Sequence, residues 1–109
     1  MDAQVRCVLD RGVVVPACPL ALTARRTLDE RRQRALCRYY AAAGAGGLAV
    51  AVHTTQFAIR DPKVGLLEPV LALAAEELTR ADRRRDEPLV RIAGVCCSVA
   101  WSSRPARWR

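Results

Sequence analysis

Three short apolar segments, separated by two longer amphipathic patterns, constrain this chain more than any other feature. The apolar segments are 12–15, 47–52 and 89–95, and the helical patterns cover 28–43 and 69–83. Short apolar runs bounded by glycine or proline are typical of buried strands, and strands that alternate with helices favour parallel, right-handed crossovers. We therefore predict an α/β fold with the order β-α-β-α-β, which begins either a doubly wound sheet or a (β/α)8 barrel.

The pattern over 28–43 carries the strongest helix signals. Thr27 and Glu30 are spaced as a capping box, in which each side chain accepts from the other residue's backbone N–H. Apolar residues then recur at helical spacing with arginines between them. On this spacing we expect Tyr39 in the core and Tyr40 on the surface. Residues 1–11 are polar and mixed, and we expect an irregular lead-in there.

The cysteine pattern and the glycine pattern both argue against a bound cofactor. The five cysteines are Cys7, Cys18, Cys37, Cys96 and Cys97. They form no Cys-x-x-Cys pair, and the chain has one histidine, so we expect neither a zinc site nor a disulfide framework. Reduced, mostly buried thiols are the simpler expectation. The first strand-to-helix turn has no Gly-x-Gly-x-x-Gly, so a dinucleotide is not expected either. We predict no cofactor and no metal.

The net charge of +7 comes almost entirely from arginine, since Lys63 is the single lysine. A basic balance can indicate nucleic-acid binding. One group of arginines is interleaved with Asp29 and Glu30, which is typical of a solvated helix face: Arg25, Arg26, Arg31, Arg32, Arg34 and Arg38. A second group, in the tail, has no acidic neighbours: Arg104, Arg107 and Arg109. The bias of the chain toward Arg, Ala, Val and Gly also raises the arginine content without any binding function. We predict no nucleic-acid partner and keep a basic nucleic-acid-binding domain as an alternative function.

The apolar runs are too short for a membrane protein. None approaches the roughly 20 residues that a membrane-spanning helix needs, and the first six residues lead into no hydrophobic signal region. The expected location is therefore the cytoplasm, without a membrane partner.

The second apolar segment runs directly into a polar triplet. His53, Thr54 and Thr55 follow the segment 47–52, so they should lie at the carboxyl end of a buried strand. Ligands of α/β proteins bind at this end of the sheet. The three residues are therefore the candidate functional site.

Several of these segments, taken in order, resemble the first part of the dihydrodipicolinate synthase/N-acetylneuraminate lyase family of class I aldolases. The similar stretches are Gly12–Leu20 (first strand and its Thr-Pro loop), Leu28-Asp29 (opening of the first helix), Gly46–Val50 with Thr54-Thr55 (second strand and the Gly-Thr-Thr-Gly-Glu motif) and Leu89–Val95 (third strand, ending in Ala-Gly-Val). The match covers about the first third of that family's barrel. His53 replaces the motif's first glycine and Gln56-Phe57 replaces its Gly-Glu, so the resemblance implies pyruvate-type chemistry without specifying the substrate.

The resemblance implies a partial (β/α)8 TIM barrel with parallel strands and a lyase that forms a Schiff base between a lysine and a 2-oxo acid. In that family the two adjacent threonines also donate hydroxyl and backbone N–H groups to the substrate carboxylate. By this resemblance Thr54 would be catalytic, through a proton relay with a tyrosine, and Thr55 and His53 would bind the substrate. The family carries its lysine on the sixth strand and its tyrosine on the fifth, and Lys63 matches neither. The resemblance thus implies a truncated family member that is not catalytic alone, with homo-oligomers expected for its full-length relatives.

The last twelve residues, 98–109, show no hydrophobic periodicity typical of a helix or a strand. We expect 1–97 to be the amino-terminal part of the barrel domain and 98–109 to be an irregular, frameshifted tail.

A small α/β binding module without catalysis is the other alternative function.

Overall fold

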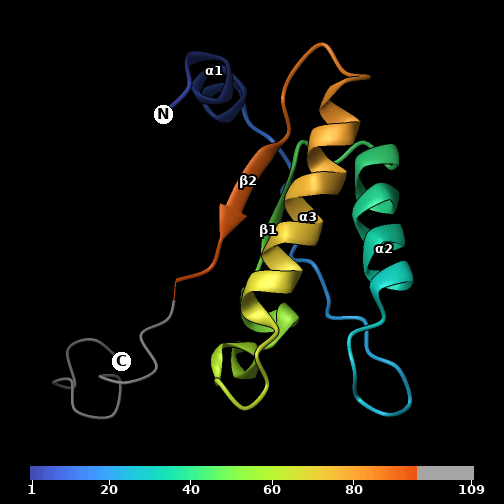
Figure 1. Cartoon of the computed structure of the whole chain (residues 1–109). Coiled ribbons are helices and arrows are strands. Elements are labelled where there is room, and N and C mark those ends of the chain that lie inside the picture. Colours follow the sequence, from blue (N-terminus) through green and yellow to red (C-terminus); the bar gives the residue numbers. More distant parts are fainter. Residues whose placement is uncertain (96–109) are drawn as a thin grey trace, which may run out of the picture.

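A computed structural model describes residues 1–95 (Figure 1). The helices and strands, in chain order, are α1 (Ala3–Arg11), α2 (Glu30–Ala42), β1 (Gly47–Val50), α3 (Leu67–Asp82) and β2 (Val90–Ala93), with two short 3-10 helices, η1 (His53–Thr55) and η2 (Phe57–Arg60), after β1. The expected α/β class and the expected order from α2 to β2 are confirmed. The expected tail lies outside the described residues.

The strands β1 and β2 are parallel, in a register that pairs Gly47 with Val90 and Val50 with Ala93. Residues 14–18 run along the other edge of β1. There the backbone N–H of Cys18 donates to Ala49 O at 2.8 Å, and Ala49 N–H donates to Pro16 O at 3.0 Å. The spatial order therefore follows the chain order: 14–18, then β1, then β2.

The first predicted strand is thus displaced and irregular. Its single ladder position pairs Ala17 with Ala49, whereas the sequence pattern predicts a strand over 12–15. Pro16 has no N–H to donate and fixes its own φ, so it interrupts a regular ladder at this point. The segment stays extended and parallel to β1 without becoming a strand.

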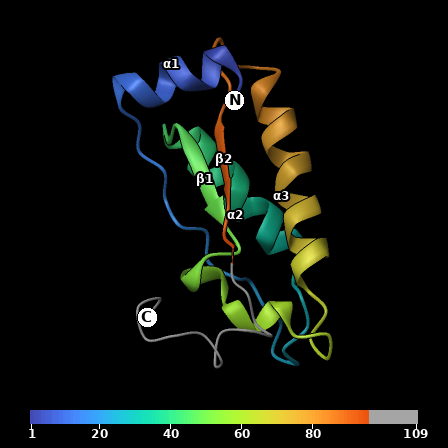
Figure 2. The ribbon, with the colours of Figure 1, turned by 90° about the vertical axis from the view of Figure 1, so that its left-hand side faces the viewer.

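Helices α2 and α3 pack side by side on one face of this small sheet, as the two views show (Figures 1 and 2). Leu48 and Val50 of β1 point toward the helices and join an apolar core cluster. The other buried members of the cluster are Cys18, Cys37, Val70, Leu73, Ala74, Leu78 and Leu89. The core consists of small and aliphatic side chains.

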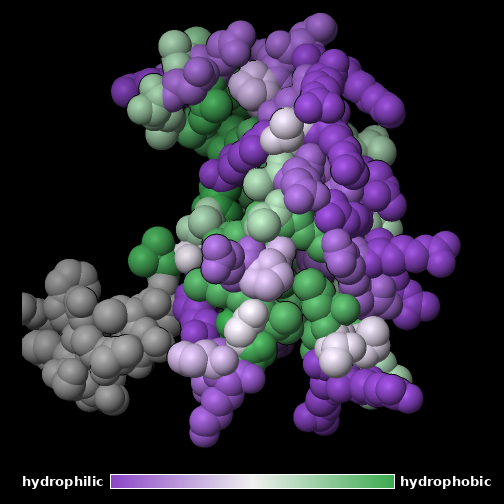
Figure 3. All heavy atoms as spheres, viewed as in Figure 1, coloured by the Kyte–Doolittle hydropathy of each residue, from purple (hydrophilic) through white to green (hydrophobic). Residues whose placement is uncertain are grey.

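The opposite face of the sheet is less covered. Residues that pair in a parallel ladder point to the same side, so Ile92 shares the side of Ala49, away from the helices. Ile92 is 44% exposed and Ala49 is half-buried. Beside β2 on the helix side, a groove of about 250 Å³ is lined by Leu71, Ala74 and Leu78 of α3 and by Ala93 of β2. On the face of the molecule that Figure 3 draws, hydrophobic residues (green) are exposed between hydrophilic ones (purple).

The amino-terminal residues form a helix, which corrects the expected irregular lead-in. The Asp2 carboxylate accepts from the backbone N–H groups of Gln4 and Val5, and the helix ends at Gly12, with φ at 97°. Arg11 Nη1 donates to Glu87 Oε1 at 2.8 Å. The cap and this long-range ion pair hold α1 across the amino ends of the strands (Figure 2).

Helix α2 starts two residues later than expected, and the expected capping box is wrong. Asp29 is the N-cap, and its carboxylate accepts from Arg32 N–H at 3.0 Å. The hydroxyl of Thr27 instead lies 2.7 Å from the hydroxyl of Thr23, within the preceding loop. The Glu30 carboxylate pairs with Arg34. The charged cap Asp29, two residues further along the chain, takes the place of Thr27.

The two tyrosines of α2 are also reversed relative to the expectation. Tyr39 is 64% exposed, and Tyr40 packs against the core cluster. The buried face of the helix includes Gln33 and Cys37, so its buried side is rotated from the one that the apolar spacing predicts. Gln33 is buried because its amide bonds Ala21 N–H and Pro19 O.

Gly47 marks a close approach between the two strands. A Cβ added at Gly47 would lie 2.5 Å from Val90 O. Only glycine fits there without a shift of the ladder. Among the described residues, no helix is both long and apolar enough to cross a bilayer.

Candidate functional site

The turn that follows β1 is the candidate functional site. It leaves the carboxyl end of β1 through η1 and η2. Two non-glycine residues in it have left-handed backbone: Ala51 with φ at 60° and Gln56 with φ at 82°. Such strained conformations persist where the surroundings hold them, and they cluster at functional sites. Both flank the predicted triplet.

His53 and Thr54 are exposed at the start of this turn. The imidazole of His53 meets the ring of Phe57 edge-on, with centroids 5.8 Å apart. Thr54 presents its side chain to solvent beside it. Two of the three residues singled out by the sequence are therefore accessible to a ligand.

Thr55 points inward instead. Its side chain is fully buried, and its hydroxyl donates to the backbone oxygen of Cys18 at 2.6 Å. Its backbone N–H donates to Val52 O at 3.0 Å. Thr55 thus connects the turn after β1 to Cys18, where the segment 14–18 leads into the loop that follows it. The structure brings these two strand-end loops together through one buried hydroxyl.

Arg60 is the residue of this turn that the sequence reasoning missed. Its Nη2 donates to Ala51 O at 2.7 Å and to Gly94 O at 2.6 Å, which are the carbonyls just beyond β1 and β2. Its guanidinium carbon lies 5.4 Å from the centre of the Phe57 ring. Nη1 is buried and has no hydrogen-bond partner among the described residues. The positive charge therefore sits at the carboxyl ends of both strands.

Arg60 forms no ion pair with its neighbour Asp61 in the described part of the chain. Asp61 Oδ1 accepts from Lys63 N–H at 2.9 Å, which closes a local turn. The sequence signal for Arg60 is weak: a lone arginine that follows Phe57 and the buried Ile59.

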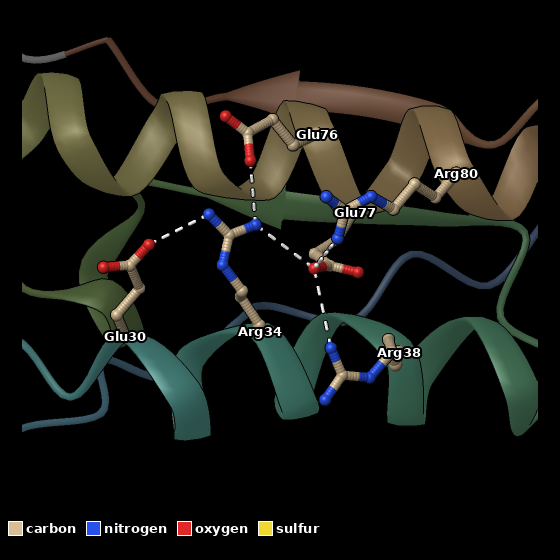
Figure 4. Close-up of polar contacts among 6 residues, drawn as sticks. All are labelled: Glu30, Arg34, Arg38, Glu76, Glu77 and Arg80. Carbon is tan, nitrogen blue, oxygen red and sulfur yellow. Dashed lines mark hydrogen bonds and ion pairs between the residues drawn. The ribbon is translucent and has the colours of Figure 1, made fainter.

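A second charged cluster lies between α2 and α3 (Figure 4). Glu77 is 3% exposed, and its Oε1 accepts from Arg34 at 3.2 Å and from Arg80 at 3.0 Å, with Arg38 at 3.5 Å. Arg34 also binds Glu30 and Glu76, and these carboxylates raise the pKa of its guanidinium. The positive charges of three arginines and the negative charges of three glutamates cancel in this cluster. The cluster therefore joins the two helices and leaves little net charge to attract a ligand.

Two of the cysteines lie in contact inside the core. Cys18 and Cys37 are both buried, and the interaction between the two thiols, together with burial, raises the pKa of Cys18, while the Cys18 thiol lowers the pKa of Cys37. Gln33 Nε2 also donates to Cys18 Sγ at 3.4 Å. Cys7 is exposed, so two of the three cysteines that the structure describes are buried, in agreement with the expectation of mostly buried thiols. No group of potential ligands that could hold a metal occurs among residues 1–95; Cys96 and Cys97 lie outside them.

The fold and the site define an α/β unit with parallel strands whose polar and charged groups gather at the strand ends. Comparisons with protein-family models, curated proteins and solved structures gave no match. Function is therefore argued from the geometry of this turn.

Proposed function

We propose that residues 12–95 form the opening β/α units of a (β/α)8 barrel that acts on a pyruvate-type 2-oxo acid through a Schiff base, as in the dihydrodipicolinate synthase/N-acetylneuraminate lyase family. The observation that carries the proposal is the order of the sheet. Three successive parallel segments lie in chain order, with both crossover helices on one face. A barrel wall is built in this way, one β/α unit after another.

The uncovered surfaces of the unit support the same proposal. The side of the sheet that bears Ile92 and Ala49 would face the interior of a barrel, where layers of side chains fill the space. The groove between α3 and β2 is apolar and is the place where the next outer helix would pack. Both surfaces lose contact with water when further units are added, which favours closure.

In the proposed chemistry, the strand-end turn recognises the 2-oxo acid. Thr54 is exposed and would take part in proton transfer through its hydroxyl, and His53 would donate to a substrate oxygen. Thr55, which the family resemblance assigns to the substrate carboxylate, would act by holding the turn that presents Thr54. Its direct contact with the substrate stays a prediction.

The Schiff-base amine is proposed to lie on a strand that these units do not include. Such a lysine must be partly neutral, which requires burial or neighbouring positive charge. Lys63 is exposed in the loop between η2 and α3. It is a solvated loop residue and does not fit the nucleophile.

A complementation experiment tests the proposal. The full chain is co-expressed with a fragment of a family member that carries the later strands, including the lysine and the tyrosine. The assembled pair is then treated with pyruvate and borohydride. We expect a reduced adduct on the fragment's lysine, with less adduct for Thr54→Val.

Thr79→Val is the matched control, because Thr79 is exposed on α3 away from the strand ends. It should leave the adduct yield unchanged. An assembled pair that forms no adduct, or an adduct on Lys63 of this chain alone, would contradict the proposal.

A further inference from the structure

The geometry points to Arg60 as the residue that binds the carboxylate of a small 2-oxo acid at the carboxyl ends of β1 and β2. This inference deepens the proposed function and rests on it for the class of ligand. Nothing in the sequence motif assigns this role to Arg60, since the resemblance places the carboxylate on the adjacent threonines.

The position of the guanidinium is fixed by the two strands themselves. Arg60 Nη2 binds Ala51 O and Gly94 O, the carbonyls that follow the last residues of β1 and β2. One arginine on η2 therefore spans two neighbouring strand ends. Ligands of parallel α/β sheets bind in front of these ends.

The remaining donor of this guanidinium is unsatisfied. Nη1 is buried and makes no hydrogen bond within residues 1–95, and no carboxylate there lies in ion-pair distance of Arg60. By contrast, the half-buried Arg34 binds three carboxylates. A buried cationic donor without an acceptor is unfavourable, and such a group calls for a partner such as an ion or a ligand. An anion would satisfy both its charge and its free N–H groups.

The neighbours of Arg60 suit a small carboxylate. Both Nη2 hydrogens are used by the two strand-end carbonyls, so the N–H groups of Nη1 are the donors left for a charge-assisted bond to a carboxylate oxygen. The Phe57 ring lies against one side of the guanidinium and is 45% exposed, with His53 edge-on to it. The exposed Thr54 lies on the same turn and could bond the adjacent oxo oxygen.

The strained backbone strengthens this assignment. Ala51 has left-handed φ, and its carbonyl is one of the two that bind Arg60. Gln56, between η1 and η2, is left-handed as well. The turn keeps a costly conformation that aligns the guanidinium with the strand ends, which is typical of a preorganised binding site.

Pyruvate titration of the full chain, followed by NMR at constant ionic strength, tests the inference. His53 is the single histidine, so its ring signal reports on the turn without ambiguity. We expect saturable shifts of His53 and of the backbone amides of Phe57, Arg60 and Gly94. Arg60→Gln should weaken binding by about tenfold or more, because it removes a charge-assisted interaction.

Arg83→Gln is the matched control, since it removes the same charge from an exposed position at the opposite end of α3. Its affinity for pyruvate should equal that of the wild type. Equal binding by Arg60→Gln, or no saturable shift in the wild-type chain, would overturn the inference.

Arg60→Gln also removes two bonds to backbone carbonyls, so its folding is checked by circular dichroism. If Arg60→Gln does not fold, the inference is tested by two other measurements: which signals of the wild-type chain shift on pyruvate addition, and whether the charge-preserving variant Arg60→Lys still binds pyruvate. Shifts confined to the turn and Gly94, with binding retained by Arg60→Lys, support the inference, and shifts elsewhere overturn it. Failure of the borohydride experiment with pyruvate binding intact would refute the proposed catalysis and leave the role of Arg60 standing.

Discussion

Replacing Thr55 by valine should destabilise the protein much more than the same replacement one residue earlier. Valine keeps the branched shape of threonine and its preference for χ1, so the change removes little besides the hydroxyl. That hydroxyl donates to Cys18 O at 2.6 Å, and both residues are fully buried. Thr54, by contrast, is exposed.

The magnitude follows from the acceptor that the substitution leaves behind. A buried carbonyl that loses its donor costs about 1–3 kcal/mol. Removal of the hydroxyl's own desolvation cost offsets part of this, so we expect a loss of about 1–2 kcal/mol in the free energy of unfolding. Thr54→Val should stay within about 0.5 kcal/mol of the wild type.

Urea unfolding followed by far-UV circular dichroism measures the difference. With a slope of about 1 kcal/mol per molar urea, the low end for a small protein, the midpoint of Thr55→Val should fall by about 1–2 M. The midpoint of Thr54→Val should hardly move. Equal midpoints for the two variants would refute the claim that the Thr55 hydroxyl joins the two strand-end loops.

Three further predictions concern the N-cap of α2, the close contact between β1 and β2, and the loss of stability at acid pH. Asp29→Ala should cost about 1 kcal/mol of unfolding free energy and Thr27→Ala clearly less, because Asp29 caps α2; thermal unfolding of both variants compares them, and a larger loss for Thr27→Ala would contradict the assignment. Gly47→Ala should cost about 1–3 kcal/mol in urea unfolding, since its Cβ would meet Val90 O; a stability equal to the wild type would show that the strands are not this close. Arg11 lowers the pKa of the Glu87 carboxyl from its ordinary value of 4.5, so the stability that Glu87 adds is present above that value and is lost as the pH falls through the lowered pKa. Glu87→Gln should therefore be slightly less stable than the wild type at pH 7 and equally stable at pH 2. A difference in unfolding free energy that persists at pH 2 would exclude this ion pair as its source.

The order of the central elements could be predicted from the sequence because it depends on local patterns. The apolar run that begins at Gly47 is short and continuous, and the pattern around Pro69 is amphipathic, so each element is specified by its own residues. The predicted bounds differ from the observed ones by only a few residues. The parallel pairing then follows from the length of the connections between strands.

The errors lie where contacts distant in sequence decide the outcome. Helix α1 is polar and short, and its ion pair from Arg11 reaches Glu87, 76 residues further along the chain. Tyr40 is buried rather than Tyr39 because α2 turns Gln33 and Cys37 toward the core. Periodicity alone could not reveal either arrangement.

The candidate site shows the same division. The position of His53 and Thr54 at a strand end could be predicted, because the apolar segment ends just before them. The role of Arg60 could not, since its burial depends on carbonyls of residues 9 and 34 positions away. The sequence shows that an arginine is charged, but it does not show whether that arginine forms an ion pair with a carboxylate in the fold.

The outer edge of β2 gives the most direct test of the claim that this sheet is part of a larger barrel. Val90 N–H donates to Gly46 O and Gly94 N–H donates to Val50 O, so the alternation along a strand directs the N–H groups of Arg91 and Ala93 to the other edge. Amide hydrogen exchange is measured by NMR on the full chain, alone and assembled with the complementing barrel fragment. We predict that Arg91 and Ala93 exchange rapidly in the chain alone and slowly in the assembly, with Val90 and Gly94 protected in both. Slow exchange of Arg91 and Ala93 in the chain alone, or no change on assembly, would contradict the account.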